Sequence, residues 1–80
     1  MMRLTVQYFA IFRDQTGCAE ESVDSNAASA ADLFQELIAR HPGLTRFEQM
    51  KVAVNDELCG WDSPLNDGDR VLLFPPVAGG

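Results

Sequence analysis

The sequence predicts an α+β domain in which one main helix packs across a mixed β-sheet, and three observations carry this prediction. Residues 29–40 show the one clear helical pattern of apolar positions. Short alternating or apolar runs of strand length stand before and after that helix. The last run, residues 71–74, is apolar at every position, which is typical of a strand in the middle of a sheet.

Length and charge limit the classes of function. Eighty residues make one domain, for which we expect a body at 1–74 and an extended tail at 75–80. A catalytic cleft is hard to fit into so small a body, so the length favours a carrier, a subunit or a binding module. The formal net charge of −6 excludes nucleic acid and anionic membranes as expected partners, because phosphate binding needs clusters of lysine and arginine.

The residue types that usually bind metals are few. Cys18 and Cys59 form no CxxC pair and have no metal-ligand spacing. His41 stands beside Pro42 at the predicted helix end, with no evident partner. We therefore expect no metal site and two reduced cysteines of an intracellular protein. The sequence shows neither a signal peptide nor a run of transmembrane length, so a soluble cytoplasmic protein is expected.

The first part of the chain predicts two strands. Residues 3–10 alternate, which places Leu4, Val6, Tyr8 and Ala10 on the core side. Residues 11–17 are predicted to form a short helical turn or loop ended by Gly17. Residues 19–23 predict a weaker strand, hairpinned to the first.

The helix at 29–40 has recognisable end signals. Ser29 can cap its N-terminus, and Asp32 three residues later resembles the acidic partner of a capping box. The segment His41-Pro42-Gly43 ends it. Its apolar stripe, expected to face the sheet, consists of Leu33, Phe34, Leu37 and Ile38.

The remaining elements follow after an ambiguous segment at 44–50. Residues 51–54 predict a third strand, Asn55-Asp56 a hairpin turn, and residues 57–59 a short return strand. The turn signal at 66–69 leads into the strand at 71–74. Two strands, one helix and three more strands follow one another, and with the strand at 71–74 in the middle and the N-terminal strand beside it they predict the β-grasp arrangement of ubiquitin.

The phase of the outer strands predicts an apolar patch on the sheet face that the helix leaves open. Phe9, Leu72 and Phe74 fall out of phase with the core positions. Irregular loops covering them are the alternative. We favour a partner surface, because large apolar groups on an open face indicate a binding site.

The tail combines stiffness with a slender end. Pro75 and Pro76 end the last strand and hold the following residues extended. Gly79 and Gly80 carry no side chains, so the end of the sequence suits insertion into a narrow channel with a carboxylate foremost. The alternative is a frayed terminus without a specific function.

The chain resembles the small subunit of molybdopterin synthase, a sulfur carrier of ubiquitin-like fold. The final segment is the most specific match. The matching residues are Tyr8-Phe-Ala10, Arg13-Asp14, Gly17, Val52-Ala-Val-Asn55, Leu65, Asp67-Gly-Asp69 and Phe74-Pro-Pro-Val-Ala-Gly-Gly80. Asp14 stands where Glu is usual, and the segment 57–61 is atypical.

The resemblance implies a function for the terminal carboxylate. An E1-like adenylyltransferase would activate Gly80 with ATP, and a sulfur donor would convert it to a thiocarboxylate, the 1-thioglycine form. The tail, Pro75, Pro76, Val77, Ala78 and Gly79, would then insert into the large subunit of a heterotetrameric synthase, where the sulfur is transferred to cyclic pyranopterin. No permanently bound cofactor is implied. The implied interface consists of Phe9, Leu58, Leu72 and Phe74, Leu58 because it matches an apolar family position.

Three alternatives remain at this stage. The chain could carry sulfur in another pathway, such as that of thiamine, although Pro75, Pro76 and the Arg13 segment argue against it. It could be a ubiquitin-like modifier joined to lysines of other proteins. It could also be a passive interaction domain, for which the tail would be dispensable.

Overall fold

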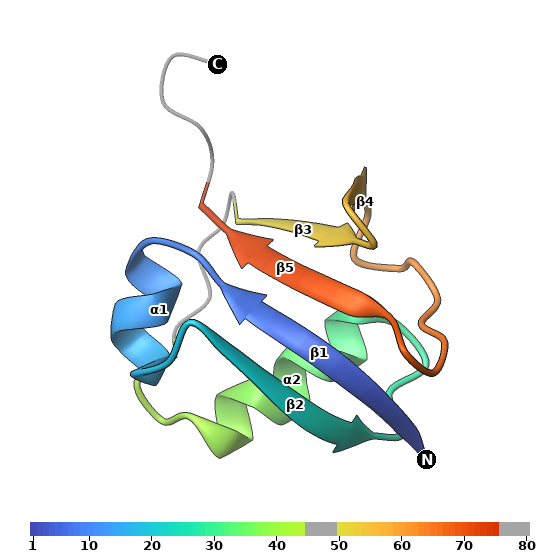
Figure 1. The fold of residues 1–80 in the computed structure, drawn as a ribbon, viewed down its shortest axis with the longest axis horizontal. Coiled ribbons are helices and arrows are strands. Elements are labelled where there is room, and N and C mark those ends of the chain that lie inside the picture. The colour runs from blue at the N-terminus through green and yellow to red at the C-terminus, as the bar shows by residue number, and fades with distance from the viewer. Residues whose placement is uncertain (45–49, 76–80) are drawn as a thin grey trace.

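A computed structural model describes residues 1–44 and 50–75, which form a five-stranded mixed sheet with one main helix across it (Figure 1). The strand order is β2-β1-β5-β3-β4. β1 and β5 run parallel, and the other neighbouring pairs are antiparallel. The elements are β1 (Met2–Tyr8), α1 (Ile11–Thr16), β2 (Glu20–Ser25), α2 (Ala30–Arg40), β3 (Lys51–Val54), β4 (Glu57–Cys59) and β5 (Arg70–Phe74). The predicted β-grasp arrangement is confirmed.

β5 occupies the middle of the sheet, as its unbroken apolar run predicts. It pairs with β1 on one side and with β3 on the other. Val71 and Leu73 point into the core and are buried, whereas Leu72 and Phe74 alternate with them and are only partly buried. The predicted phase of this strand is therefore confirmed.

α2 begins and ends where the sequence predicts. The Ser29 hydroxyl oxygen accepts a hydrogen bond from the Asp32 backbone amide at 3.3 Å, which caps the first turn. At the other end the His41 amide donates to the Leu37 carbonyl. Leu33, Phe34 and Leu37 are buried against the sheet, and Ile38 lies at the edge of this core.

The core lies between α2 and the sheet and includes residues from the connection between α2 and β3. Leu44 and Met50, on either side of the segment 45–49 that lies outside the described residues, are both buried.

Neither helix in the described part of the chain has the length and apolar character needed to cross a bilayer.

The prediction for the first strand is wrong at its end. β1 stops at Tyr8, and Ala10 is exposed with φ 54° and ψ −123° at the start of α1. The chain turns here because the Phe9 amide still donates to the Leu73 carbonyl, while Phe12 must reach the core, where it is fully buried. A positive φ at alanine is strained, and the tertiary fold imposes it against the local alternation.

β2 continues to Ser25, beyond the predicted end at Val23. Ser25 is buried, yet its hydroxyl group is satisfied on both sides. It donates to Glu36 Oε1 at 2.7 Å and accepts from the Ala27 amide at 2.9 Å. A serine can therefore occupy an inward-facing position at the end of the strand, because its buried hydroxyl group has both a hydrogen-bond donor and an acceptor beside it.

The β3–β4 hairpin is confirmed residue by residue. Asn55 and Asp56 both have positive φ, 53° and 70°, as a type I′ turn requires. Gly68, at φ 87°, makes the predicted turn before β5.

Candidate functional site

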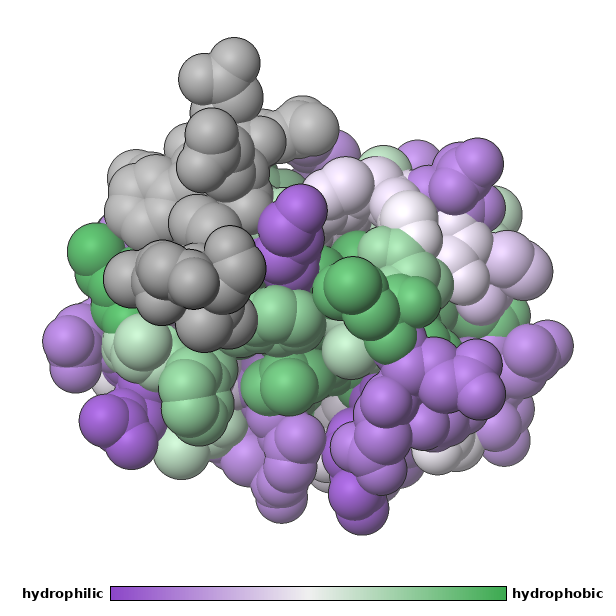
Figure 2. Space-filling view, turned by 90° about the horizontal axis from the view of Figure 1, so that it is seen from above, coloured by the Kyte–Doolittle hydropathy of each residue, from purple (hydrophilic) through white to green (hydrophobic). Residues whose placement is uncertain are grey.

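The sheet face opposite α2 carries an apolar patch, which we define as Phe9, Leu58, Leu72 and Phe74. Strand pairing explains why they meet: Leu72 lies opposite Ala53, and Ala53 opposite Leu58. Phe9 follows β1 and is 61% exposed, and Leu58 is 68% exposed. Figure 2 looks down on the molecule and shows apolar side chains gathered across the middle of this view, with hydrophilic ones on both sides.

A shallow hollow of about 360 Å³ adjoins this patch at the edge formed by β1 and β2. Gln7 is one of its lining residues and donates through Nε2 to Glu20 Oε1 at 2.9 Å. The lining residues are Gln7, Tyr8, Phe9, Arg13, Ala19, Glu20 and Leu72. The patch thus continues into a small concave surface and offers contact area for a partner.

The tail leaves the sheet from its central strand. Phe74 ends β5, and Pro75 follows it, partly buried. Pro76, Val77, Ala78, Gly79 and Gly80 lie outside the described residues, so the reach of the tail and the role of Gly80 stay predictions. The described part places the start of the tail beside the patch, because Phe74 belongs to the patch and directly precedes Pro75.

Glu21 is the centre of a polar network on the opposite face of the sheet, beside the C-terminal end of α2. Its Oε2 accepts from the Tyr8 hydroxyl at 2.6 Å and lies 2.5 Å from His41 Nε2. Its Oε1 accepts from Arg40 at 3.3 Å. The Tyr8 and His41 rings meet edge to face, with centroids 5.7 Å apart.

The network shifts the titration of both Tyr8 and Glu21. Burial, and then the hydrogen bond and negative charge of Glu21, raise the pKa of the Tyr8 hydroxyl far above its ordinary value. For Glu21, burial acts to raise the pKa, but hydrogen bonds from Tyr8 and His41 and the charges beside it lower the pKa overall. The carboxylate is therefore held in its ionised form.

The expectation that His41 has no partner is wrong. The histidine contacts Glu21 directly, and Cys18 also lies close to both. Spacing along the chain could not show this, because the three residues come from a loop, a strand and a helix end. One signal was present: Glu21 is in phase with the inward-facing Val23 and Ser25, so a charged side chain had to be accommodated on the core face.

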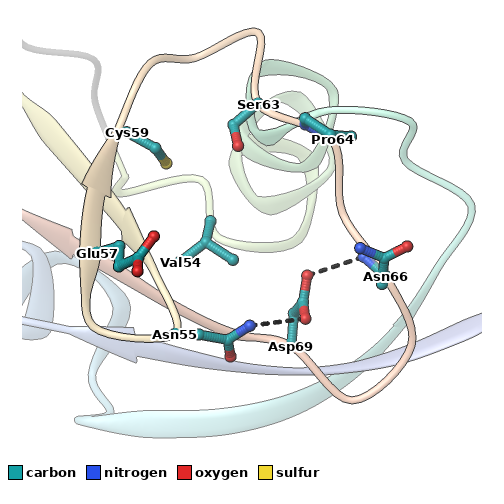
Figure 3. A pocket seen from close by; sticks show the side chains of 8 residues that line it. All are labelled: Val54, Asn55, Glu57, Cys59, Ser63, Pro64, Asn66 and Asp69. Atoms are coloured by element: carbon teal, nitrogen blue, oxygen red, sulfur yellow. Dashed lines mark hydrogen bonds between the residues drawn. The ribbon is translucent and has the colours of Figure 1, made fainter.

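A second hollow of about 330 Å³ lies between the β3–β4 hairpin and the loop before β5 (Figure 3). Asp69 is buried there, and both of its carboxylate oxygens accept hydrogen bonds. One accepts from the side-chain Nδ2 of Asn55 at 2.9 Å, and the other from the backbone amide of Asn66 at 2.8 Å. Both oxygens therefore have partners, and the arrangement ties the hairpin turn to the start of β5. Among the described residues, no buried side-chain nitrogen or oxygen lacks a hydrogen-bond partner.

The fold and the patch together define a ubiquitin-like β-grasp protein with an apolar face beside the exit of its C-terminal tail. The family model described as the ThiS family matches residues 6–80, from the first strand to the last glycine. The chain belongs to the ThiS family.

Three similar proteins illustrate this kinship. The molybdopterin synthase sulfur carrier subunit of Chlamydomonas reinhardtii is 35% identical, over 99% of this chain and 100% of the relative. A chain in the complex of subunits 1 and 2 of molybdopterin-converting factor from Helicobacter pylori is 27% identical, with TM-score 0.68, and the match covers 99% of this chain and 100% of that one. SAMP1 of Haloferax volcanii is 26% identical, with TM-score 0.82, over 98% and 99% of the two chains. The predicted resemblance to the sulfur carrier subunits is confirmed.

Proposed function

We propose that this chain is the sulfur carrier subunit of a molybdopterin synthase. The observation that carries the proposal is the full-length similarity to the Chlamydomonas reinhardtii sulfur carrier subunit, together with a family match that runs through Gly80. The apolar patch supports it, because a carrier must dock on the protein that uses its cargo.

The reacting group in this proposal is the carboxylate of Gly80. A carboxylate is a poor electrophile, so an activating enzyme first joins it to ATP as an acyl-adenylate and releases pyrophosphate. A sulfur donor then attacks the acyl carbon, AMP leaves, and a thiocarboxylate remains on Gly80. Its anionic sulfur is a competent nucleophile, by the reasoning that makes a thiolate the reactive form of cysteine.

The large subunit of the synthase is the proposed partner for the next step. It holds the pyranopterin precursor, which the thiocarboxylate sulfur attacks: a carbon–sulfur bond forms, and an oxygen substituent leaves that carbon with the bonding electron pair. Water then cleaves the acyl–sulfur bond, which leaves sulfur on the precursor and restores the carboxylate. The complex of subunits 1 and 2 from Helicobacter pylori supports such a partner for a chain of this fold.

The patch and the tail would act together in that complex. Phe74 is part of the patch and directly precedes Pro75, so a partner seated on the patch lies beside the start of the tail. Docking would then fix the point from which the last five residues extend. The patch would supply the binding energy, and the terminal thiocarboxylate would supply the sulfur that reacts.

Intact mass spectrometry tests this proposal directly. The purified chain is incubated with the activating enzyme, ATP and a sulfur source, and we expect a gain equal to sulfur replacing one oxygen. Deletion of Gly80, or addition of one residue after it, should abolish both the gain and the transfer of sulfur to the precursor. Gly79→Val should slow either the activation of Gly80 or the insertion of the tail, because the valine side chain crowds the channel.

The two cysteines provide matched controls. Cys18→Ser and Cys59→Ser should both keep the mass gain, because the mobile sulfur is on the terminal carboxyl group. Loss of transfer in either cysteine variant, or full transfer by the extended chain, would contradict the thiocarboxylate assignment.

The similarity to SAMP1, whose name stands for small archaeal modifier protein 1, leaves one second candidate, a protein modifier that would be attached to lysines of other proteins. In that case cell extracts should contain isopeptide-linked adducts of the chain rather than free thiocarboxylate. A chain that supplies sulfur to thiazole formation and not to pyranopterin would instead support the thiamine pathway.

A further inference from the structure

Three side chains with metal-binding atoms converge beside the C-terminal end of α2, on the opposite face of the sheet from the patch. Cys18 comes from the loop before β2, Glu21 from β2, and His41 from the residue that follows α2. The Cys18 sulfur, a Glu21 carboxylate oxygen and a His41 ring nitrogen lie within 4.8 Å of one another. We propose that Cys18, Glu21 and His41 bind a Zn²⁺ ion.

The spacing of the three atoms fits a tetrahedral ion after small adjustments. Zinc–ligand bonds of about 2.0–2.3 Å place neighbouring ligand atoms roughly 3.3–3.7 Å apart. The 2.5 Å contact between His41 Nε2 and Glu21 Oε2 must therefore open, and atoms up to 4.8 Å apart must close, each by about 1 Å. All three side chains are partly buried, so rotations of this size do not require the core to move.

The surroundings already orient the carboxylate. Arg40 donates to Glu21 Oε1, which leaves Oε2 to bind the ion through one oxygen. The Tyr8 hydroxyl donates to Oε2 and restricts the rotation of the carboxylate. Ligating carboxylates in metal sites are usually held by such donors, and the Tyr8 ring also contacts the edge of the His41 ring.

Charge and ligand type select the ion. A thiolate and a carboxylate carry two negative charges, which balance those of a divalent cation in a half-buried site. Sulfur with imidazole nitrogen suits zinc and not calcium or magnesium, which prefer oxygen ligands. Binding requires the thiolate, so the Cys18 thiol releases its proton to solvent as the Zn–S bond forms.

Three protein ligands leave one position of a tetrahedral ion for water. The bound ion would join three segments: the loop after α1, the edge strand β2 and the C-terminal end of α2. A ligand that binds only the folded state stabilises it. Zinc bound by these three segments would fix this end of α2 against the edge of the sheet.

Cobalt spectroscopy on the untagged, reduced, full-length chain tests the site. Co²⁺ bound by a thiolate should produce a sulfur-to-metal charge-transfer band in the near ultraviolet, and one equivalent of Zn²⁺ should remove it. Cys18→Ser should lose the band. Cys59→Ser is the matched control and should retain it, because Cys59 lies on β4, outside the cluster, and contacts the Val52 carbonyl.

Affinity and stability provide the second readout. His41→Gln should raise the Kd for Co²⁺ by at least about 100-fold, since it removes a direct ligand. Free Zn²⁺ at about 100 times its Kd should raise the Tm of the wild type and of Cys59→Ser by roughly 15 °C, and that of Cys18→Ser by much less. Circular dichroism of the metal-free variants separates loss of the site from loss of the fold.

Two results would overturn the inference. One is the absence of a charge-transfer band in the folded wild-type chain. The other is a band that persists in Cys18→Ser or disappears in Cys59→Ser. Neither result bears on the proposed sulfur transfer, which is measured at Gly80.

Discussion

Leu58 and Leu73 are both strand leucines, but they lie on opposite faces of the sheet, and truncating each to alanine separates docking from folding. Leu73 is 1% exposed inside the core, whereas Leu58 is 68% exposed in the patch. Leu73→Ala removes buried methyl groups and should lower the free energy of unfolding by about 2–5 kcal/mol. Leu58→Ala should change it by less than about 0.5 kcal/mol.

The effect on binding follows from the same exposures. Full burial of a leucine side chain is worth about 1.5–3 kcal/mol. Because 68% of Leu58 is still exposed, docking on the patch can gain about two thirds of that amount, or about 1–2 kcal/mol. The Kd for the large subunit should therefore rise about 5- to 30-fold in Leu58→Ala.

Two assays complete the comparison. Urea unfolding followed by circular dichroism gives the stability of each variant, and isothermal titration calorimetry with the large subunit gives its Kd. Under conditions where Leu73→Ala is folded, its Kd should match that of the wild type. An unchanged Kd for Leu58→Ala, or a large loss of stability in that variant, would refute the assignment of this face as the docking surface.

Two further predictions concern the fold. Leu37→Ala should lower the free energy of unfolding by about 2–5 kcal/mol, since Leu37 is buried under the sheet. The control Gln35→Ala, on the exposed side of α2, should lower it by less than about 0.5 kcal/mol. Equal losses of stability in urea unfolding would contradict the orientation of the helix. Ala10→Gly should stabilise the chain by about 0.5–2 kcal/mol. Glycine relieves the backbone strain at φ 54° in the folded state, and this gain exceeds the free-energy cost of the greater conformational freedom of glycine in the unfolded chain. In contrast, Ala39→Gly on the exposed side of α2 should destabilise by about 1 kcal/mol, and a loss of stability in both variants would show that Ala10 is unstrained.

The elements with strong local signals could be predicted from the sequence almost to the residue. Ser29 caps α2 through its own side chain, and Asn55-Asp56 suits a two-residue hairpin turn, so nearby residues alone determine where α2, β3 and β4 begin or end. The phase of the apolar residues in β5 also predicted that Leu72 and Phe74 point away from the core.

The features that the sequence did not reveal depend on partners far along the chain. The contact between Glu21 and His41 exists only because β2 pairs with β1 and α2 ends above that edge. The end of β1 depends on the Leu73 carbonyl, which comes from the opposite end of the chain.

The central position of β5 makes synthesis of residues 70–74 a condition for folding of the sheet. β5 lies between β1 and β3, so a nascent chain that ends before residue 70 has two separate hairpins, β1–β2 and β3–β4, and no continuous sheet. The parallel pairing of β1 with β5 joins residues more than sixty positions apart, so this step closes the largest loop and is expected to come late. Partner recognition needs the same strand, because Leu72 and Phe74 belong to the patch. A chain that ends before β5 therefore lacks two of the four patch residues as well as the central strand of the sheet.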